Sequence, residues 1–182
     1  MSEKITVKDL DEMKPDQARG ILAECCGSSK WVNEMTARRP YRTFDNVLKA
    51  ADEAADTMDT HDWLAAFAHH PRIGEGSGSA PEKGVAAWWA AKEQAGMDVA
   101  GNDVKAALMN ANEEHDRKFG YIYIVCATGM SAEEMLDNAR KRLKNDGEKE
   151  LAVSAHEQRK ITRLRLEKLI ERDDEKGKGA KR

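Results

Sequence analysis

Apolar residues recur every three or four positions along most of this chain, which is the spacing of one face of an α-helix. In one stretch, Thr43 can cap a helix whose apolar stripe comprises Phe44, Val47, Leu48, Ala51 and Ala55. Similar stripes predict helices at about 15–26, 30–39, 61–70, 81–95, 103–119, 132–143 and 148–172, with Thr60 and Ser131 as two further caps. The pattern predicts an all-α fold, a compact array of about seven to nine helices in one domain of residues 1–172.

One segment departs from this pattern. "YIYIVCA", residues 121–127, is rich in aromatic and β-branched side chains, which favour strands. No other segment offers an obvious partner strand, and a lone strand would leave its backbone groups without hydrogen bonds. We therefore expect a buried helical or extended segment in the middle of the core.

Composition and charge narrow the class of protein. Charged residues make up 35% of the chain, but the net charge is only −3. The chain is not basic overall, so its net charge does not favour binding to nucleic acid. No apolar run is long enough to span a membrane, and the acidic, polar N-terminus is unlike a signal peptide. Three cysteines, two of them adjacent, do not make a disulfide framework. We expect a cytoplasmic protein with a disordered, charged tail at 173–182.

The stretch "AHHPRIGEGSGSAPEK", residues 68–83, is the first candidate for chemistry. His70 precedes Pro71, and because a residue before proline avoids the helical backbone, a helix should end there and leave His70 at the mouth of a glycine-rich loop. A histidine in such a place can exchange protons near neutral pH. The alternative is a histidine that only stabilises the helix C-terminus. His69 faces elsewhere and is expected to be structural or exposed.

Two charged side chains on apolar helix faces are further candidates. Glu93 lies one turn from Trp89, so it is either a general acid or base or a glutamate at the rim that reaches solvent. Gln94 beside it offers both a donor and an acceptor. Arg165 lies between aliphatic residues four positions away on either side, so it either binds an anionic or carbonyl-rich ligand or forms an internal salt bridge.

A metal site is a separate alternative. A zinc ion would need several of the histidines His61, His69, His70 and His115 to meet. No H-E-x-x-H or Cys-x-x-Cys spacing supports such a site, and His115 lies on an apolar helix stripe where a core histidine is more common. The residues therefore favour a protein without a metal.

Five motifs follow one another along the chain: "AHHPRIGE", "KEQAG", "NEEHDRKFGYIYIVCATG", "RLKND" and "KITRLRLEKL". In this order they resemble the 2-oxo-4-hydroxy-4-carboxy-5-ureidoimidazoline (OHCU) decarboxylases, which catalyse the last step from urate to (S)-allantoin, and the resemblance covers roughly residues 5–172. The resemblance implies an all-α, usually homodimeric enzyme that uses no metal or organic cofactor. It also implies that residues 121–127 are helix or loop rather than strand.

The resemblance also implies a set of site residues. The family's catalytic histidine corresponds to His70, its Glu-Gln pair to Glu93 and Gln94, and its substrate-binding arginine to Arg165. The binding site would further include Pro71, Ile122 and Ile124, with the backbone of 122–124 lining the pocket. Glu93 would act with His70 in catalysis, and the remaining residues would hold the substrate.

Two positions depart from the family pattern. Ala90 stands where the family often has a serine, three residues before the glutamate, and His115 stands where relatives often have a tyrosine. The first change removes a hydroxyl from the expected pocket. A catalytically silent helical protein that binds a partner through its tryptophan-rich face is therefore the alternative to a decarboxylase.

Overall fold

The computed structural model describes residues 4–72 and 101–172. These residues form eight α-helices and no strand, which confirms the all-α prediction. The helices are α1 (Val7–Glu12), α2 (Pro15–Cys25), α3 (Ser29–Ala37), α4 (Phe44–Asp56), α5 (Thr60–Phe67), α7 (Asn102–Phe119), α8 (Ala132–Arg142) and α9 (Gly147–Leu169). The helix predicted at 81–95 and the tail predicted at 173–182 lie outside the described residues. None of the described helices is both long and apolar enough to cross a membrane.

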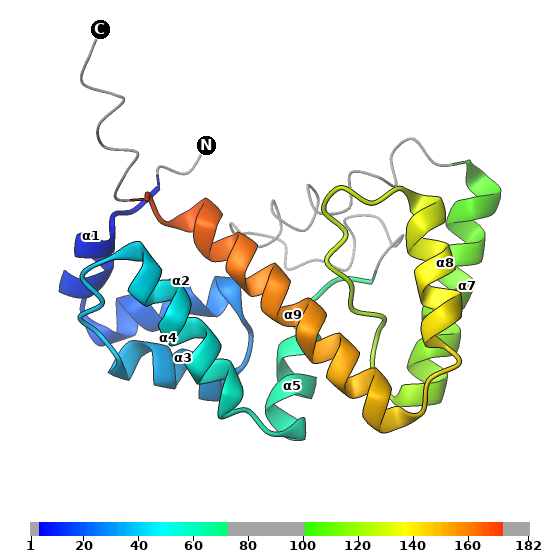
Figure 1. Ribbon diagram of the computed structural model, residues 1–182, viewed down its shortest axis with the longest axis horizontal. Coiled ribbons are helices and arrows are strands. Elements are labelled where there is room, and N and C mark those ends of the chain that lie inside the picture. Colours follow the sequence, from blue (N-terminus) through cyan, green and yellow to red (C-terminus); the bar gives the residue numbers. More distant parts are fainter. Residues whose placement is uncertain (1–3, 73–100, 173–182) are drawn as a thin grey trace, which may run out of the picture.

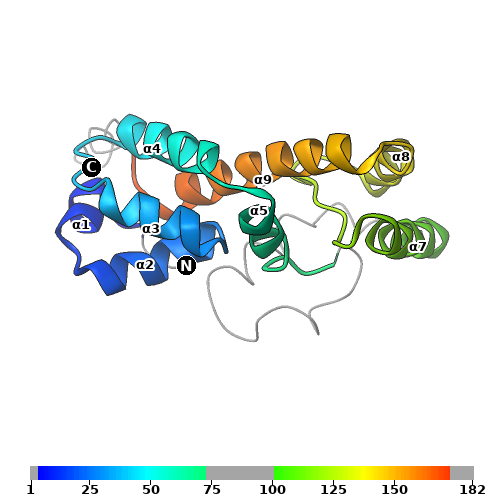
Figure 2. The ribbon, with the colours of Figure 1, turned by 90° about the horizontal axis from the view of Figure 1, so that it is seen from below.

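Helix α9 runs diagonally across the molecule and connects its two ends (Figure 1). Helices α2, α4 and α5 pack against it, whereas α7 and α8 pack on each other near its N-terminal end. Seen from below, α1 to α4 gather at one end and α7 and α8 at the other, with α5 between them (Figure 2). Side chains along α9 are therefore placed to meet elements that are far apart in the sequence.

The helix boundaries follow local capping chemistry. Thr43 and Ser131 cap α4 and α8 as predicted. The prediction of Thr60 as the cap of α5 is wrong, because the Asp59 carboxylate accepts from the Asp62 N–H and makes a capping box. Helix α5 also ends at Phe67, earlier than predicted. The chain winds on to residue 70 in tighter turns whose N–H groups bond to carbonyls three residues back.

The 121–127 segment is neither helix nor strand, and its side chains alternate between two hydrophobic clusters. The larger cluster lies between α1 to α5 and α9. Tyr121 packs against it, and from residue 122 onwards every second residue does so: Ile122, Ile124 and Cys126. The smaller cluster lies around α7 and α8 and takes the intervening residues: Tyr123, Val125 and Ala127. Alternation of this kind is the property of an extended chain. The strand-like composition therefore reflects an extended segment buried on both sides, and the helical alternative is wrong.

Side chains replace a partner strand along this segment. The Tyr123 N–H donates to Asn112 Oδ1 at 3.1 Å, and the Cys126 N–H donates to Glu157 Oε2 at 2.8 Å. Asn112 lies on α7 and Glu157 on α9, so the segment is held from both sides. This answers the difficulty of an unpaired strand, because buried N–H groups need an acceptor of any kind rather than a neighbouring strand.

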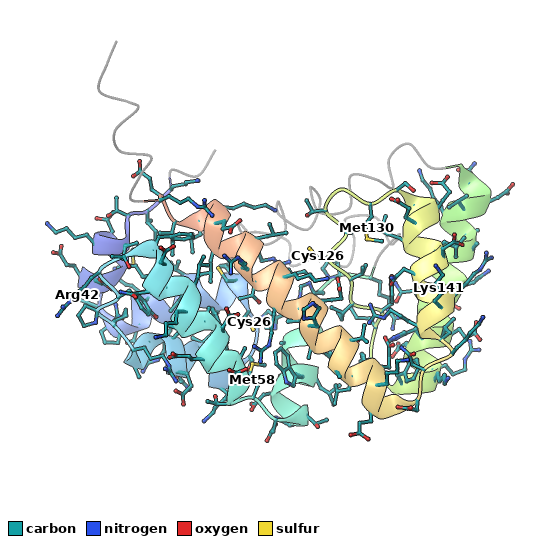
Figure 3. The ribbon with its side chains drawn as sticks, in the orientation of Figure 1. Cys26, Arg42, Met58, Cys126, Met130 and Lys141 are labelled. Atoms are coloured by element: carbon teal, nitrogen blue, oxygen red, sulfur yellow. The ribbon has the colours of Figure 1, made fainter. Side chains whose placement is uncertain are left out.

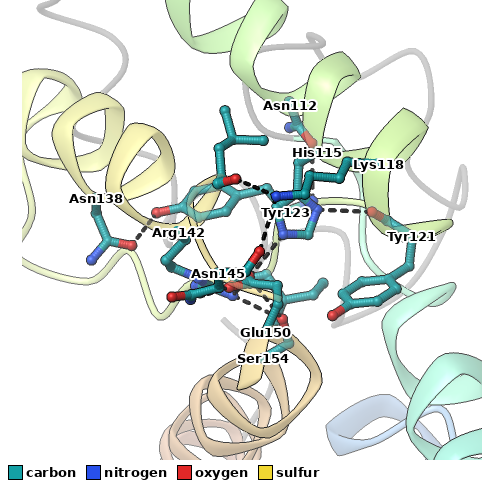
Figure 4. Close-up of polar contacts among 12 residues, drawn as sticks. Asn112, His115, Lys118, Tyr121, Tyr123, Asn138, Arg142, Asn145, Glu150 and Ser154 are labelled. Carbon is teal, nitrogen blue, oxygen red and sulfur yellow. Dashed lines mark hydrogen bonds and ion pairs between the residues drawn. The ribbon is translucent and has the colours of Figure 1, made fainter. Parts of the chain in front are cut away.

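Two carbonyls of the segment lead into a buried polar network (Figure 4). His115 donates from Nδ1 to the Tyr121 carbonyl at 3.0 Å, and Arg142 donates from Nη1 to the Ile124 carbonyl at 2.6 Å. Both donors also bind one carboxylate, that of Glu150, with His115 Nε2 and Arg142 Nε each 2.8 Å from its Oε1. His115 is fully buried and is thus the core histidine that its apolar stripe suggested.

Glu150 stays ionised in this network. Burial by itself raises the pKa of the Glu150 carboxyl, but hydrogen bonds from His115, Arg142 and the Asn145 amide outweigh burial and lower the pKa to about 2. The carboxylate thereby joins α7, α8 and α9 at one point. Breaking a buried charged group away from its partners typically costs about 3–5 kcal/mol.

We predict that this carboxylate makes the fold acid-sensitive. The folded pKa is about 2 and the ordinary value is 4.5, so the stabilisation is fully present above pH 4.5 and is lost as the pH falls towards 2. The difference corresponds to roughly 3 kcal/mol of the free energy of unfolding. Thermal melts between pH 6 and 2 should show a steep loss of stability in this window.

Glu150→Gln tests the assignment. The variant should be less stable at neutral pH, and its free energy of unfolding should fall less between pH 4.5 and 2 than that of the wild type. Glu148→Gln, an exposed glutamate on the same helix, is the matched control and should keep the wild-type slope. An unchanged slope in Glu150→Gln would mean that other carboxylates cause the acid sensitivity.

Candidate functional site

One face of α9 carries a line of buried polar side chains. Its members are spaced by four and then three residues, and each is at most 5% exposed: Glu150, Ser154, Gln158, Thr162 and Arg165. This spacing places them in one row along the helix. Glu150 and Ser154 belong to the structural network described above. The other three lie at the opposite, C-terminal half of α9, where the candidate site is found.

His70 meets this row through Gln158. Its Nε2 atom lies 2.7 Å from Gln158 Oε1, a contact across 88 residues of sequence. His70 and Pro71 are both half-buried. Phe67, the last residue of α5, packs on Tyr121 with ring centroids 5.2 Å apart. The end of α5 is therefore fixed against the 121–127 segment, and His70 is presented to the face of α9.

The hydrogen bonds continue from Gln158 along the row. Its amide Nε2 donates to Thr162 Oγ1 at 3.2 Å, and the Thr162 hydroxyl in turn hydrogen-bonds to the Cys26 thiol. Burial raises the pKa of Cys26 to about 11, so this thiol stays neutral at physiological pH. Cys26 lies on the side of α9 that faces α2 and α4, whereas Cys126 lies on the other side (Figure 3).

Arg165 is the charged end of the row. Its side chain is buried, and Nη1 donates to the Glu24 carbonyl near the end of α2 at 3.3 Å. Arg163, two residues earlier, is exposed and pairs with Glu167 at 3.5 Å. Arg165 therefore lies on the buried face of α9 and Arg163 on its solvent face. A buried guanidinium has five N–H donors in a planar fork, which suits oxygen atoms of a bound ligand.

His69 has a packing role instead. It is exposed on one side, but its ring lies so close to Gly27 that a Cβ atom on Gly27 would overlap it. The junction of α2 and α3 therefore requires glycine to accommodate the end of α5. This agrees with the expectation that His69 is structural or exposed.

The chain just after His70 is held to α7 at Arg72. Arg72 forms an ion pair with Asp116, one residue after the buried His115. Each of these two side chains is 32% exposed. The anchor fixes the chain on the far side of Pro71, so His70 is restrained both by the turns before it and by the ion pair after it.

The other predicted site residues fall in two groups. Ile122 and Ile124 lie in the extended segment, where the Ile124 carbonyl is already an acceptor for Arg142. Glu93 and Gln94 lie outside the described residues, as does Ala90. The structure therefore brings His70 close to α9 and buries Arg165 on the same helix, while the Glu-Gln pair stays a prediction.

The histidines of the zinc alternative lie in different places. His70 contacts Gln158, and both nitrogens of His115 are hydrogen-bonded within the structural network. Within the described ranges, the group with metal-binding geometry is instead Asp59, His61 and Asp62 at the start of α5. Its two carboxylates already form the capping box of that helix.

Gln158 and Thr162 are the site residues that the sequence analysis missed. A signal for them exists, because polar residues recur at 150, 154, 158 and 162, each one turn apart. Polar residues at this spacing usually form the solvent face of a helix. The pattern is informative only once the surrounding helices show that this face is buried.

A sequence profile of the OHCU decarboxylase family matches residues 11–167. The chain belongs to this family. A relative in Arabidopsis thaliana, the uric acid degradation bifunctional protein TTL, is 32% identical over 146 residues, which are 80% of this chain and 45% of that protein. The OHCU decarboxylase of Amia calva is 30% identical over 78 residues, 43% of this chain and 45% of that one. The matched segments thus cover less than half the length of each of these curated relatives.

Solved structures agree with this assignment. A crystal structure of an OHCU decarboxylase, determined in the presence of (S)-allantoin, has a TM-score of 0.71 and 30% sequence identity. The match covers 86% of this chain and 98% of that one. An (S)-allantoin synthase structure with 16% identity and a TM-score of 0.66 shares the fold, over 91% of this chain and 54% of that one.

Proposed function

We propose that this protein decarboxylates OHCU to (S)-allantoin and carbon dioxide in urate breakdown. The observation that carries the proposal is the placement of His70 against the buried polar face of α9 on which Arg165 lies two turns further on. These two residues correspond to the family's catalytic histidine and substrate-binding arginine. The solved relative that matches over nearly its whole length was crystallised with (S)-allantoin, the product of this reaction.

The reaction needs little more than positioned proton donors and acceptors. The substrate carries a carboxylate and a hydroxyl on one ring carbon, next to a C=N carbon that bears the ureido group. As the carboxylate leaves as carbon dioxide, its bonding pair forms a C=C bond, and the C=N pair moves to the ring nitrogen, which takes up a proton. The resulting enol loses its O–H proton and gains one on the ureido-bearing carbon. The ring itself is the electron sink, so the chemistry calls for no organic cofactor.

Two of the described residues take part in these steps. His70 takes the hydroxyl proton, since an imidazole exchanges protons near neutral pH. Arg165 binds a carbonyl or carboxylate oxygen of the substrate and so fixes the ring relative to His70. Glu93 would hold the ureido N–H groups or orient His70, and Gln94 would hydrogen-bond the ring amide, as the family resemblance implies.

We also propose that the protein works as a homodimer in the cytoplasm. The dimer follows from the family resemblance. The location is supported by three cysteines that are all free, two of them buried, as expected in a reducing compartment. Size-exclusion chromatography with light scattering tests the dimer directly.

The activity is tested with OHCU generated in situ, by oxidising urate in the presence of hydroxyisourate hydrolase. Because proton delivery in a closed site occurs on one face, circular dichroism should show an (S)-allantoin signal that grows faster than the spontaneous racemic background. A racemic product formed at an enzyme-dependent rate would contradict positioned proton delivery. No enzyme-dependent product at all would favour the silent partner-binding protein instead.

A further inference from the structure

The catalytic histidine of the proposed reaction has a partner that none of the five family motifs assigns a role in the site. We propose that Gln158 is a positioning residue that fixes the orientation of His70 and the ring nitrogen that carries its proton. Only the kinetic test of this inference, the effect on kcat, rests on the proposed decarboxylase activity. The structural part of the inference concerns the free protein and is measured without substrate.

The direction of the hydrogen bonds follows from the chemistry of the amide. Gln158 Nε2 can only donate, and it donates to Thr162 Oγ1. The amide oxygen therefore faces His70, 2.7 Å from Nε2. An oxygen at that distance accepts a hydrogen, so His70 carries a proton on Nε2 and the lone pair of the neutral ring is on Nδ1. In this arrangement Nδ1 is the atom that takes the hydroxyl proton of the enol.

Gln158 is itself held rigidly. It is 1% exposed, and its amide cannot rotate without giving up the bond to Thr162. The Thr162 hydroxyl contacts the Cys26 thiol, so the chain of hydrogen bonds from His70 ends in a neutral group. A buried amide between two fixed partners is a better orienting group than an exposed one, because little rotamer freedom is left to lose when the substrate binds.

A glutamine is suited to this task for a further reason. A carboxylate at the same place would attract a second proton to His70 and keep it as imidazolium, which cannot act as a base. The neutral amide orients the ring without that effect. The charged and titratable groups of the described residues near the Thr162 end of the row are Arg159, Arg163, Arg165 and Cys26, with Asp52 across from them on α4. On the side of His70, the Arg72–Asp116 ion pair follows two residues later. They are the same in every variant below.

The first test is the tautomer of His70 by ¹⁵N–¹H NMR. The chain has five histidines, so the signal is assigned by its absence in His70→Asn. The wild type should show the Nε2–H form, and Gln158→Leu should lose this preference. Ser154→Ala, which removes a buried hydroxyl one turn earlier on the same row, should leave the His70 signal unchanged. A wild type in the Nδ1–H form, or a Gln158→Leu signal equal to that of the wild type, would overturn the proposal.

The second test is the pH profile of kcat. Gln158→Leu should lower kcat about 10- to 100-fold with a smaller change in KM, the size of effect seen when a hydrogen bond that orients a histidine is removed. Gln158→Glu keeps the size and shape of the side chain. It should nevertheless move the acidic limb of the kcat profile to higher pH, because the carboxylate favours protonated His70. Identical limbs in Gln158→Glu and the wild type would refute a positioning role.

The two proposals fail in different ways. A wild type that makes no (S)-allantoin but shows the Nε2–H tautomer dependent on Gln158 would overturn the proposed function and leave the positioning contact in place. An active wild type whose tautomer and pH profile do not respond to Gln158 would overturn only the positioning role.

Discussion

His70→Asn is expected to lower kcat for (S)-allantoin formation by about 10²–10⁴, the usual contribution of a general acid or base. Asparagine preserves a polar amide at the position of the inner ring atoms, although it is too short to replace the Nε2 contact with Gln158, and it cannot exchange a proton near neutral pH. Product binding and the thermal melt should therefore change little. The measurement is the initial rate by circular dichroism, together with (S)-allantoin affinity by calorimetry.

His69→Asn is the matched control, because the two histidines are adjacent but are held differently. His70 is half-buried and bonds to α9, whereas His69 is exposed and packs on Gly27. His69→Asn should keep kcat near the wild-type value, with a modest loss of stability at most. An inactive His69→Asn variant, or full activity in both the His69→Asn and His70→Asn variants, would contradict the assignment of His70 as the catalytic histidine.

The helices were predictable because each has a single apolar face with a period near 3.6 residues. Helix α4 is the clearest case, since its stripe and its Thr43 cap are both local features of the sequence. Helix α1 was not predicted, because six residues are too few to establish a period. The end of α5 was misplaced because backbone bonds to the third residue back can continue a turn after the helix itself has stopped.

The 121–127 segment shows a different limit. Its composition correctly indicates an extended chain, but the sequence alone cannot reveal that side chains such as Asn112 and Glu157 take the place of a neighbouring strand. These partners are 11 and 31 residues away and lie on helices whose packing is set by other contacts. Composition thus predicts the local backbone, whereas hydrogen-bond partners depend on the tertiary arrangement.

The candidate site was predictable only in part for the same reason. His70 was found through Pro71, and Arg165 through its aliphatic neighbours, which are local signals. The one-turn spacing of Gln158 and Thr162 with other polar residues does not identify a site by itself, because a polar residue on a helix is ordinarily solvated. The structure reveals their role by burying the whole row on α9.

Arg165→Lys is expected to reduce kcat/KM about 10- to 100-fold, mainly through a higher KM. The guanidinium donates to the Glu24 carbonyl from one nitrogen, and the geometry of its planar fork suits a second planar oxygen. A lysine ammonium is a single point of charge and cannot contact that carbonyl and a planar substrate oxygen in the same fixed geometry. Hydrogen bonds to charged groups are worth about 1.5–3 kcal/mol each, which corresponds to the expected change in kcat/KM.

Arg163→Lys on the same helix is the control, because Arg163 is exposed and pairs only loosely, with its Nε 3.5 Å from Glu167. It should stay close to the wild type in both KM and stability. The thermal melt separates the two possible roles of Arg165. A lower melting temperature with unchanged KM would show that Arg165 only joins α9 to the end of α2. A higher KM with a nearly unchanged melt would support a contact between the guanidinium and the substrate, because the fold would then be intact while the affinity of the site is reduced.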